Sequence, residues 1–263
     1  MTAFLETRRK NKMTEIKTIG RIYNDFTEKF GIPHQSGRLN KQRAKIVFEP
    51  EYRIPEAFRG LEEYTHIWLI WQFSENIRET WSPTVRPPRL GGNIRKGVFA
   101  TRSPFRPNSL GLSAVRLERV EFHRELGPVL YVTGADLMNG TPIFDIKPYI
   151  PTDCRPEASG GFTERIKDHR LKVVFPEKWL EKIPEEIREP LTEVLENDPR
   201  PGYQSDPDRV YGIAYGGKNI RFRVAEGVLT VCGAEDYRKN RSASDKGAPG
   251  EEKETAGKNI EER

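Results

Sequence analysis

The chain has 263 residues, of which 35% are hydrophobic and 32% are charged, and its net charge is +5. This length allows one large domain or two modest ones with a buried core. No apolar run is long enough to span a membrane, and the first twenty residues lack the apolar segment of a secretion signal.

The two cysteines, Cys154 and Cys232, form no disulfide framework, and together with the four histidines they give no zinc-binding spacing. We therefore expect a protein of the reducing cytoplasm that holds no metal. The positive net charge favours an anionic partner, but only weakly, because the excess of basic residues is small. No nucleotide-binding glycine fingerprint is present, and neither Ser103 nor Ser113 has the sequence setting of a hydrolase nucleophile.

The first half of the sequence predicts short strands separated by glycine and proline. One short helix is expected at residues 55–61, with a proline near its start. Strands at this spacing without intervening helices predict a mainly β fold, an antiparallel barrel or sandwich rather than a doubly wound sheet. The runs rich in β-branched and aromatic residues lie at residues 16–23, 44–48, 66–73, 98–100, 112–122, 129–134 and 143–149.

The pattern changes near residues 158–161. A strand is expected at residues 171–175, and a helix at residues 176–197 that Pro184 and Pro190 should break. Three further strands then form a meander with tight glycine-containing turns, at residues 210–215, 219–225 and 228–233.

Alternation in the middle strand of this meander places its apolar residues on one face and Arg221 and Arg223 on the other. The sequence thus predicts a barrel domain at residues 14–158 and a small α+β domain with a basic face at residues 159–237. Residues 238–263 are polar and charged with almost no apolar content, which predicts a disordered tail.

Positive charge is concentrated in the segment from residue 78 to residue 108, which has seven basic residues and one acidic residue, Glu79. Five prolines in the same segment predict a stiff loop whose cations share one surface, although a solvated basic loop has the same composition. The basic residues are Arg78, Arg86, Arg89, Arg95, Lys96, Arg102 and Arg106.

Three polar clusters stand out along the chain. The first holds Arg102, Arg106 and Asn108, which suit a carboxylate or a phosphate. The second, residues 135–153, places Asp136, Asp145, Lys147, Tyr149 and Asp153 around strand ends, although Asp136 and Asn139 also suit a turn before Gly140. The third, residues 197–204, follows a helix, and Asp198 or Arg200 could equally cap that helix or brace a turn. The residues alone leave each of these alternatives open.

Five motifs together resemble the TsaA-like, TrmO-type family of tRNA methyltransferases, and the resemblance covers nearly everything between Gly20 and Glu235. The motifs are KFGIPHQSG (29–37), GLEEYTHIWLIWQF (60–73), WSPTVRPPRLGGNIRKGVFATRSPFRPNSLGLS (81–113), DLMNGTPIFDIKPYIP (136–151) and NDPRPGYQ (197–204). The resemblance implies a small β-barrel that binds S-adenosylmethionine without a Rossmann sheet. It also implies a homodimer that methylates N6 of threonylcarbamoyl-adenosine beside the anticodon of tRNA.

The family's cofactor contacts carry over position by position. They fall on Pro33, His34, Gln35, Ser74, Glu75, Arg102, Leu112, Leu137, Met138, Asn139 and Gly140. The chain departs from the family where it has His34 in place of arginine, Ser109 in place of proline and Asn139 in place of aspartate. His34 replaces a permanent cation with a group that is near neutrality at pH 7, which weakens any pairing with a carboxylate there.

Methyl transfer to N6 needs alignment and modest help in removing a proton. Asp136, Asp145, Lys147 and Tyr149 are the candidates for this, and the alternative role for Lys147 is that of a buried ion-pair partner of Asp145 or Asp136.

For the tRNA anticodon stem-loop, the candidates are basic side chains together with Asp198 and Tyr203 of the third cluster. Tyr203 could stack on an unpaired base or simply pack in the domain, whereas Trp68, Trp71 and Trp81 are expected in the core or at a dimer interface. The basic candidates are Arg86, Arg89, Arg95, Lys96, Arg106, Arg200, Arg221 and Arg223. Two other readings stay open: a non-catalytic module that binds the cofactor and RNA, and a methyltransferase of the same fold with another substrate.

Overall fold

The computed structural model describes residues 15–33, 35–77, 80–87, 94–162, 170–200 and 206–237. Three of the residues singled out for binding, His34, Arg89 and Tyr203, lie outside the described residues, as does the predicted tail at residues 238–263.

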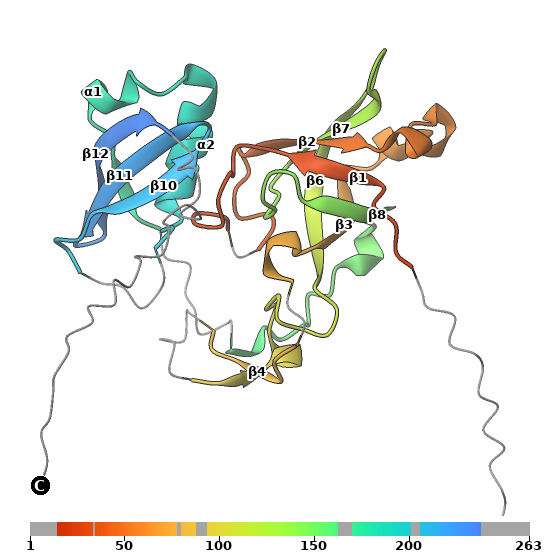
Figure 1. Cartoon of the computed structure of the whole chain (residues 1–263), viewed down its shortest axis with the longest axis horizontal. Coiled ribbons are helices and arrows are strands. Elements are labelled where there is room, and N and C mark those ends of the chain that lie inside the picture. The colour runs from red at the N-terminus through yellow and green to blue at the C-terminus, as the bar shows by residue number, and fades with distance from the viewer. Residues whose placement is uncertain are drawn as a thin grey trace, which may run out of the picture.

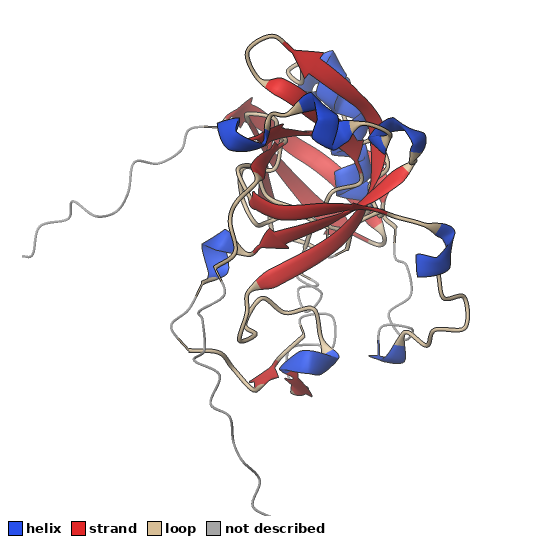
Figure 2. Ribbon diagram, turned by 90° about the vertical axis from the view of Figure 1, so that its right-hand side faces the viewer, coloured by secondary structure: helices blue, strands red, loops and turns tan. Residues whose placement is uncertain are grey.

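Six strands close into a barrel in which every neighbouring pair is antiparallel (Figures 1 and 2). Alternate residues of the strand β3 (His66–Gln72) point inward, so that Ile67, Leu69 and Trp71 are buried. The prediction of a mainly β fold with a small antiparallel barrel is confirmed. The order around the barrel is β1 (Gly20–Tyr23), β2 (Arg43–Phe48), β7 (Gly127–Thr133), β6 (Leu110–His123), β3 (His66–Gln72) and β8 (Pro142–Pro148).

Short 3-10 helices connect the strands, and one of them occupies the strand predicted at residues 98–100. Only Val98 is buried in this helix, η6 (Val98–Ala100), and its carbonyl accepts hydrogen bonds from the Thr101 amide and hydroxyl. Thr101 therefore closes a turn at residues 98–101. The β-branched and aromatic composition of residues 98–100 had predicted a strand there instead. Among the described residues, the other 3-10 helices are η1 (Pro50–Tyr52), η2 (Pro55–Phe58), η3 (Leu61–Glu63), η4 (Ser74–Asn76) and η7 (Pro151–Asp153).

A long excursion leaves the barrel between η4 and β6. It carries the basic, proline-rich segment, and a small ribbon of β4 (Thr84–Val85) and β5 (Lys96–Gly97) forms its centre. In Figure 1 the β4 strand of this ribbon projects below the barrel, away from β1 and β2.

The second half forms a four-stranded sheet covered by two helices, α1 (Glu177–Leu180) and α2 (Glu185–Glu196). Its strand order is β10 (Tyr211–Tyr215), β11 (Lys218–Ala225), β12 (Val228–Asp236) and β9 (Lys172–Val174), with β9 parallel to β12. The alternation predicted for β11 is confirmed, because its apolar residues are buried and its arginines exposed. The basic face is partly neutralised, since Arg221 pairs with Glu235 at 2.5 Å.

The predicted helix breaks at Pro184 but continues through Pro190, contrary to expectation. Pro190 is buried and is the sixth residue of α2. The carbonyl that loses its partner belongs to Glu186, an exposed residue in the first turn, where water can take the place of the missing N–H.

The connection between β1 and β2, residues 24–42, joins the two halves. Phe26 and Leu39 are buried in the core of the second half, and the Phe26 ring meets Tyr215 edge-on at 5.3 Å. The buried Glu193 of α2 accepts the backbone amides of Asn40 and Lys41, each at 2.9 Å. The connection is therefore a shared element that belongs to the barrel by sequence and to the second core by packing.

Replacing Glu193 with glutamine should lower the free energy of unfolding by about 1–3 kcal/mol, because one of the two backbone amides then faces an amide NH2 group. Urea unfolding of the full chain measures this change. The matched control is Glu189→Gln on the same helix, whose side chain is 71% exposed and pairs only with a lysine ammonium. The control should change stability by less than about 0.5 kcal/mol. Equal effects of the two substitutions would contradict the assigned role of Glu193.

Candidate active site

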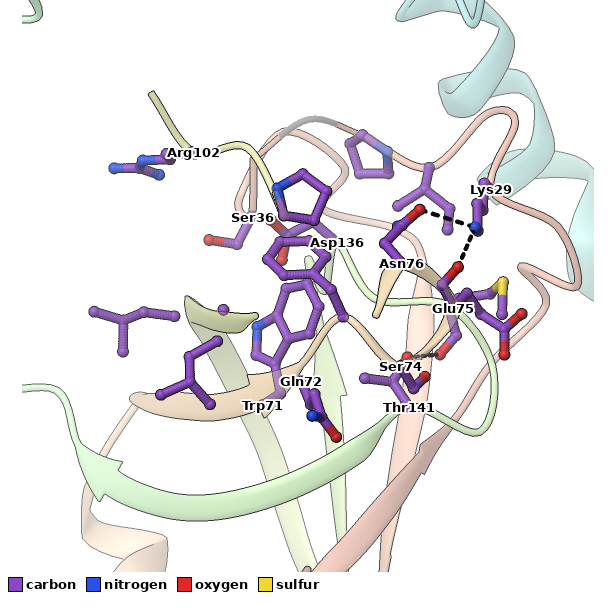
Figure 3. Close-up of a pocket in the computed structure, with 18 of the residues that line it drawn as sticks. Lys29, Ser36, Trp71, Gln72, Ser74, Glu75, Asn76, Arg102, Asp136 and Thr141 are labelled. Atoms are coloured by element: carbon purple, nitrogen blue, oxygen red, sulfur yellow. Dashed lines mark hydrogen bonds between the residues drawn. The ribbon is translucent and has the colours of Figure 1, made fainter. Parts of the chain in front are cut away.

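A pocket of about 770 Å³ lies where five segments that are distant in sequence converge (Figure 3). One wall comes from the β1–β2 connection, and a second comes from β3 and η4. The basic excursion and the start of β6 form a third, the turn after β7 forms a fourth, and Tyr149 after β8 completes the pocket. Pairing of β3 with both β6 and β8 brings these segments to one place.

A tryptophan at the end of β3 fixes the centre of the site. Trp71 lies directly opposite Gly111 of β6, and a Cβ atom at Gly111 would come within 2.2 Å of the indole. Only glycine therefore lets the indole lie against the neighbouring strand. The ring also packs on Phe73 with centroids 4.3 Å apart, so its position is fixed from two sides.

A chain of hydrogen bonds leads from this indole to a carboxylate. The Trp71 Nε1–H group donates to Ser113 Oγ at 2.9 Å, and the buried Ser113 hydroxyl donates to Asp136 Oδ1 at 2.5 Å. The direction is set by chemistry, because an indole can only donate and the hydroxyl then has its own proton free for the carboxylate. Asp136 Oδ1 is thereby held as an acceptor.

Burial raises the pKa of the Asp136 carboxyl above its ordinary value. The Ser113 hydroxyl, the backbone amides of Asp136 and Ser36 and the charge of Arg102 act in the opposite direction, but burial is the larger influence. The side chain lines the pocket, and Figure 3 shows it close to Ser36 and Trp71. Asp136 thus combines the increased basicity and the fixed orientation that proton transfer requires.

On another side of the pocket, a lysine ties the β1–β2 connection to η4. Lys29 Nζ donates to the Glu75 carbonyl at 2.7 Å and to Asn76 Oδ1 at 3.0 Å, as the dashed lines of Figure 3 show. Sequence reasoning did not single out Lys29, Ser36, Trp71 or Ser113 as site residues. The hydrogen-bond partners of Lys29, Trp71 and Ser113 lie 23 to 47 positions away along the chain, so no local pattern marks them.

The structure brings together six of the residues predicted for the cofactor. The predicted catalytic residue Asp136, the candidate Tyr149 and the predicted RNA contact Arg106 line the same pocket. The six are Pro33, Ser74, Glu75, Arg102, Leu112 and Met138.

The other predicted cofactor residues that the structure describes are not among the side chains lining this pocket. Leu137 is fully buried in the barrel core. Asn139 turns away, so that its Oδ1 accepts the backbone amide of Asn24 at 3.1 Å. Gly140 makes a tight turn with φ of +82°, and its carbonyl accepts from Arg21. Gln35 lies in the connection next to Ser36 without lining the pocket.

Two of the three predicted catalytic residues pair with each other away from the pocket. Lys147 Nζ and Asp145 Oδ2 are 3.0 Å apart on β8, with their side chains 62% and 46% exposed. This pair corresponds to the ion-pair alternative for Lys147. Of the three predicted catalytic residues, only Asp136 lines the pocket.

The predicted RNA contacts fall into two groups. Arg86 and Arg95 lie on the excursion, where Arg95 donates to Thr84 Oγ1 at 3.0 Å. Arg200 instead forms a two-point ion pair with Asp198, with both N–O distances at 2.8 Å and its side chain only 12% exposed. Asp198 has a positive φ of 49°, so this pair braces the turn after α2, as the structural alternative for this cluster anticipated.

Comparisons with known proteins follow the same division of the chain. The model of the tRNA-methyltransferase O N-terminal domain matches residues 21–154, and that of the TrmO C-terminal domain matches residues 168–236. The chain belongs to the TrmO family.

Three relatives of this TrmO-family chain illustrate the similarity. The tRNA (adenine(37)-N6)-methyltransferase of Escherichia coli is 36% identical, over 84% of this chain and 97% of the relative. A putative S-adenosylmethionine-dependent methyltransferase, RcsF, of Pseudomonas aeruginosa is 39% identical, over 75% of this chain and 87% of the relative. A crystal structure of TrmO from Pseudomonas aeruginosa has a TM-score of 0.67 at 30% identity, covering 84% of this chain and 98% of that one.

Two negative findings apply to the part of the chain that the structure describes. No group of three or more histidine, cysteine, aspartate or glutamate side chains there is arranged to hold a metal ion. Within the same residues, no helix is long and apolar enough to cross a membrane.

Replacing Asp136 with asparagine should stabilise the folded protein at neutral pH. A raised pKa means that the folded state disfavours the ionised carboxyl. The wild-type free energy of unfolding therefore falls as the pH rises from the ordinary pKa of 3.8 through the raised value. Asparagine stays neutral, so its advantage should appear across this window and persist above it.

Urea unfolding at a series of pH values measures the difference between the two proteins. The control is Asp145→Asn, because that carboxylate is half-exposed and paired with a lysine. A stabilisation by Asp136→Asn that is the same below pH 3.8 as at pH 7 would show that burial of the charge is not its cause.

Proposed function

We propose that this TrmO-family chain transfers a methyl group from S-adenosylmethionine to N6 of adenine 37 in tRNA. The observation that carries the proposal is the half-buried Asp136, oriented through Ser113 and Trp71, in a pocket that it shares with Arg102. Family membership and the names of the relatives supply the reaction class. We further propose that the adenine carries a threonylcarbamoyl group, as the sequence resemblance implies.

The pocket fits S-adenosylmethionine in size and in chemistry. A volume of about 770 Å³ lies within the range of small-molecule sites. Arg102 offers a guanidinium to the carboxylate of the amino acid portion. Leu112 and Met138 offer apolar contact to the adenine, and the side-chain carboxylates of Asp136 and Glu75 suit a cation. When bound, the cofactor supplies a methyl group that is already activated by its sulfonium.

The chain's own residues then need to align the acceptor nitrogen and remove its proton. Asp136 is suited to take the proton from N6, because its raised pKa increases its basicity and Ser113 fixes its orientation. The Ser113 hydroxyl donates to Oδ1, so one oxygen of the carboxylate keeps a fixed partner. Packing of Trp71 on Gly111 keeps this geometry from relaxing.

We also propose that the protein works as a homodimer in the cytoplasm, where tRNA is found. The support for the dimer is the family resemblance, together with exposed apolar side chains near the pocket. Ile77, which follows η4, is 59% exposed, and Leu112 is 57% exposed. Sedimentation analysis of the full chain measures the oligomeric state.

Methyl transfer from labelled S-adenosylmethionine to bulk tRNA tests the function. We expect label on tRNA that carries threonylcarbamoyl-adenosine and none on tRNA prepared without this modification. Binding of the cofactor without transfer would favour a non-catalytic cofactor- and RNA-binding module. Transfer to a small molecule or a protein that is insensitive to salt would favour a different acceptor.

Asp136→Asn should lower kcat by roughly 100-fold or more, because general acid–base groups contribute about that factor. The dissociation constant of the cofactor, measured by calorimetry, should change much less. The same substitution at Asp145 separates the two candidate carboxylates and should lower kcat far less. A larger loss of kcat in Asp145→Asn than in Asp136→Asn would move the proton acceptor to β8.

A further inference from the structure

Two aromatic side chains of the basic excursion are exposed and stacked on each other. Trp81 is 49% exposed and Phe99 is 73% exposed, and their ring centroids lie 6.0 Å apart at an interplanar angle of 28°. Sequence analysis placed Trp81 in the core or at a dimer interface, and the structure takes it out of the core. We call this pair the aromatic platform.

Backbone hydrogen bonds hold the platform in place from both sides. The Ser82 amide, next to Trp81, donates to the Phe105 carbonyl at 3.1 Å. The Val98 amide, next to Phe99, donates to the Pro83 carbonyl at 3.0 Å, and the Val98 side chain is buried. Both aromatic residues are thus displayed on a braced loop, so little conformational entropy would be lost when a ligand stacks on them.

The platform lies beside the proposed active site and in a field of positive charge. Thr101 and Arg102, two and three residues beyond Phe99, line the pocket, and Arg106 donates to the Thr101 carbonyl at 2.9 Å. The sequence from residue 81 to residue 109 contains six arginine or lysine residues and no acidic residue. Positive charge thus lies on both sides of Phe99 in the sequence, which favours an anionic ligand beside the pocket.

We propose that the aromatic platform stacks an unpaired base of the tRNA anticodon loop next to the adenine that is methylated. This inference rests on the proposed function and adds a binding subsite to it. Proteins that bind single-stranded nucleic acid combine stacking side chains with a basic surface that follows the phosphates, and the excursion has both. A base paired within a helix presents no free face, so the platform selects the loop rather than the stem.

Binding of an anticodon stem-loop RNA to the full chain tests the platform, with the dissociation constant measured by fluorescence anisotropy. Phe99→Ala and Trp81→Ala should each raise this constant about tenfold, since loss of one stacked base costs roughly that much. Phe99→Tyr should bind like the wild type, and Phe99→Leu, which keeps apolar bulk without an aromatic face, should not. The matched control is Phe122→Ala, at an aromatic residue of β6 that is 59% exposed.

Two further comparisons separate stacking from charge. A fully paired duplex RNA of equal length should bind wild type and Phe99→Ala equally. The dependence of log K on log salt should keep its slope in the aromatic variants, whereas Arg86→Ala should reduce the slope by about 0.7 for a single-stranded phosphate contact. Calorimetry of S-adenosylmethionine binding should give the same constant for Phe99→Ala and the wild type.

The platform would be overturned if Phe99→Ala, Phe122→Ala and the wild type bound the stem-loop RNA with the same dissociation constant. If the wild type still methylated tRNA, the proposed function would remain intact. Conversion of a dimer into a monomer by Phe99→Ala in sedimentation would overturn the platform too, by making the pair a contact between two copies. A wild type that methylates no tRNA would instead refute the proposed function, whatever the aromatic variants do.

Discussion

The hydrogen bond that Ser113 donates to Asp136 is the interaction on which the rest of the site depends. Its direction is imposed by Trp71, because an indole N–H has no lone pair to offer. The Ser113 hydroxyl therefore cannot reverse the direction of its hydrogen bond, and it always donates to one oxygen of the Asp136 carboxylate. The barrel provides this arrangement by placing β3, β6 and β7 side by side, with glycine at the β6 position opposite the indole.

This arrangement has an energetic cost that points to function. Keeping a carboxylate half-buried beside apolar side chains lowers stability at neutral pH, since the raised pKa marks a folded state that disfavours the charge. Stability alone would favour an amide or an apolar residue there. The exposed aromatic rings and unbalanced positive charge of the excursion are a second departure from what folding alone would select. The second departure lies next to the pocket that holds Asp136, since Thr101 and Arg102 of the same excursion line that pocket.

Local patterns predicted most of the strands, because alternation and turn residues act over short distances. The family resemblance, rather than these patterns, supplied several of the residues that line the pocket, including Arg102 and Met138. The local patterns failed where a long-range partner decides the outcome. Lys29 and Ser113 are polar residues without a local pattern, and only closure of the barrel brings them to Asn76 and Asp136. The same reason explains Asn139, whose side chain is drawn to the Asn24 amide.

The shared connection between β1 and β2 has a consequence for how the protein unfolds. Its Phe26 and Leu39 complete the core of the second half, while Pro33 and Ser36 line the pocket of the first. Any ligand that tightens this segment must also stabilise the second half, and loss of the second half would leave two large apolar side chains uncovered. Thermodynamic linkage therefore makes the two halves one cooperative unit. The stability of α2 then depends on whether a ligand occupies the pocket.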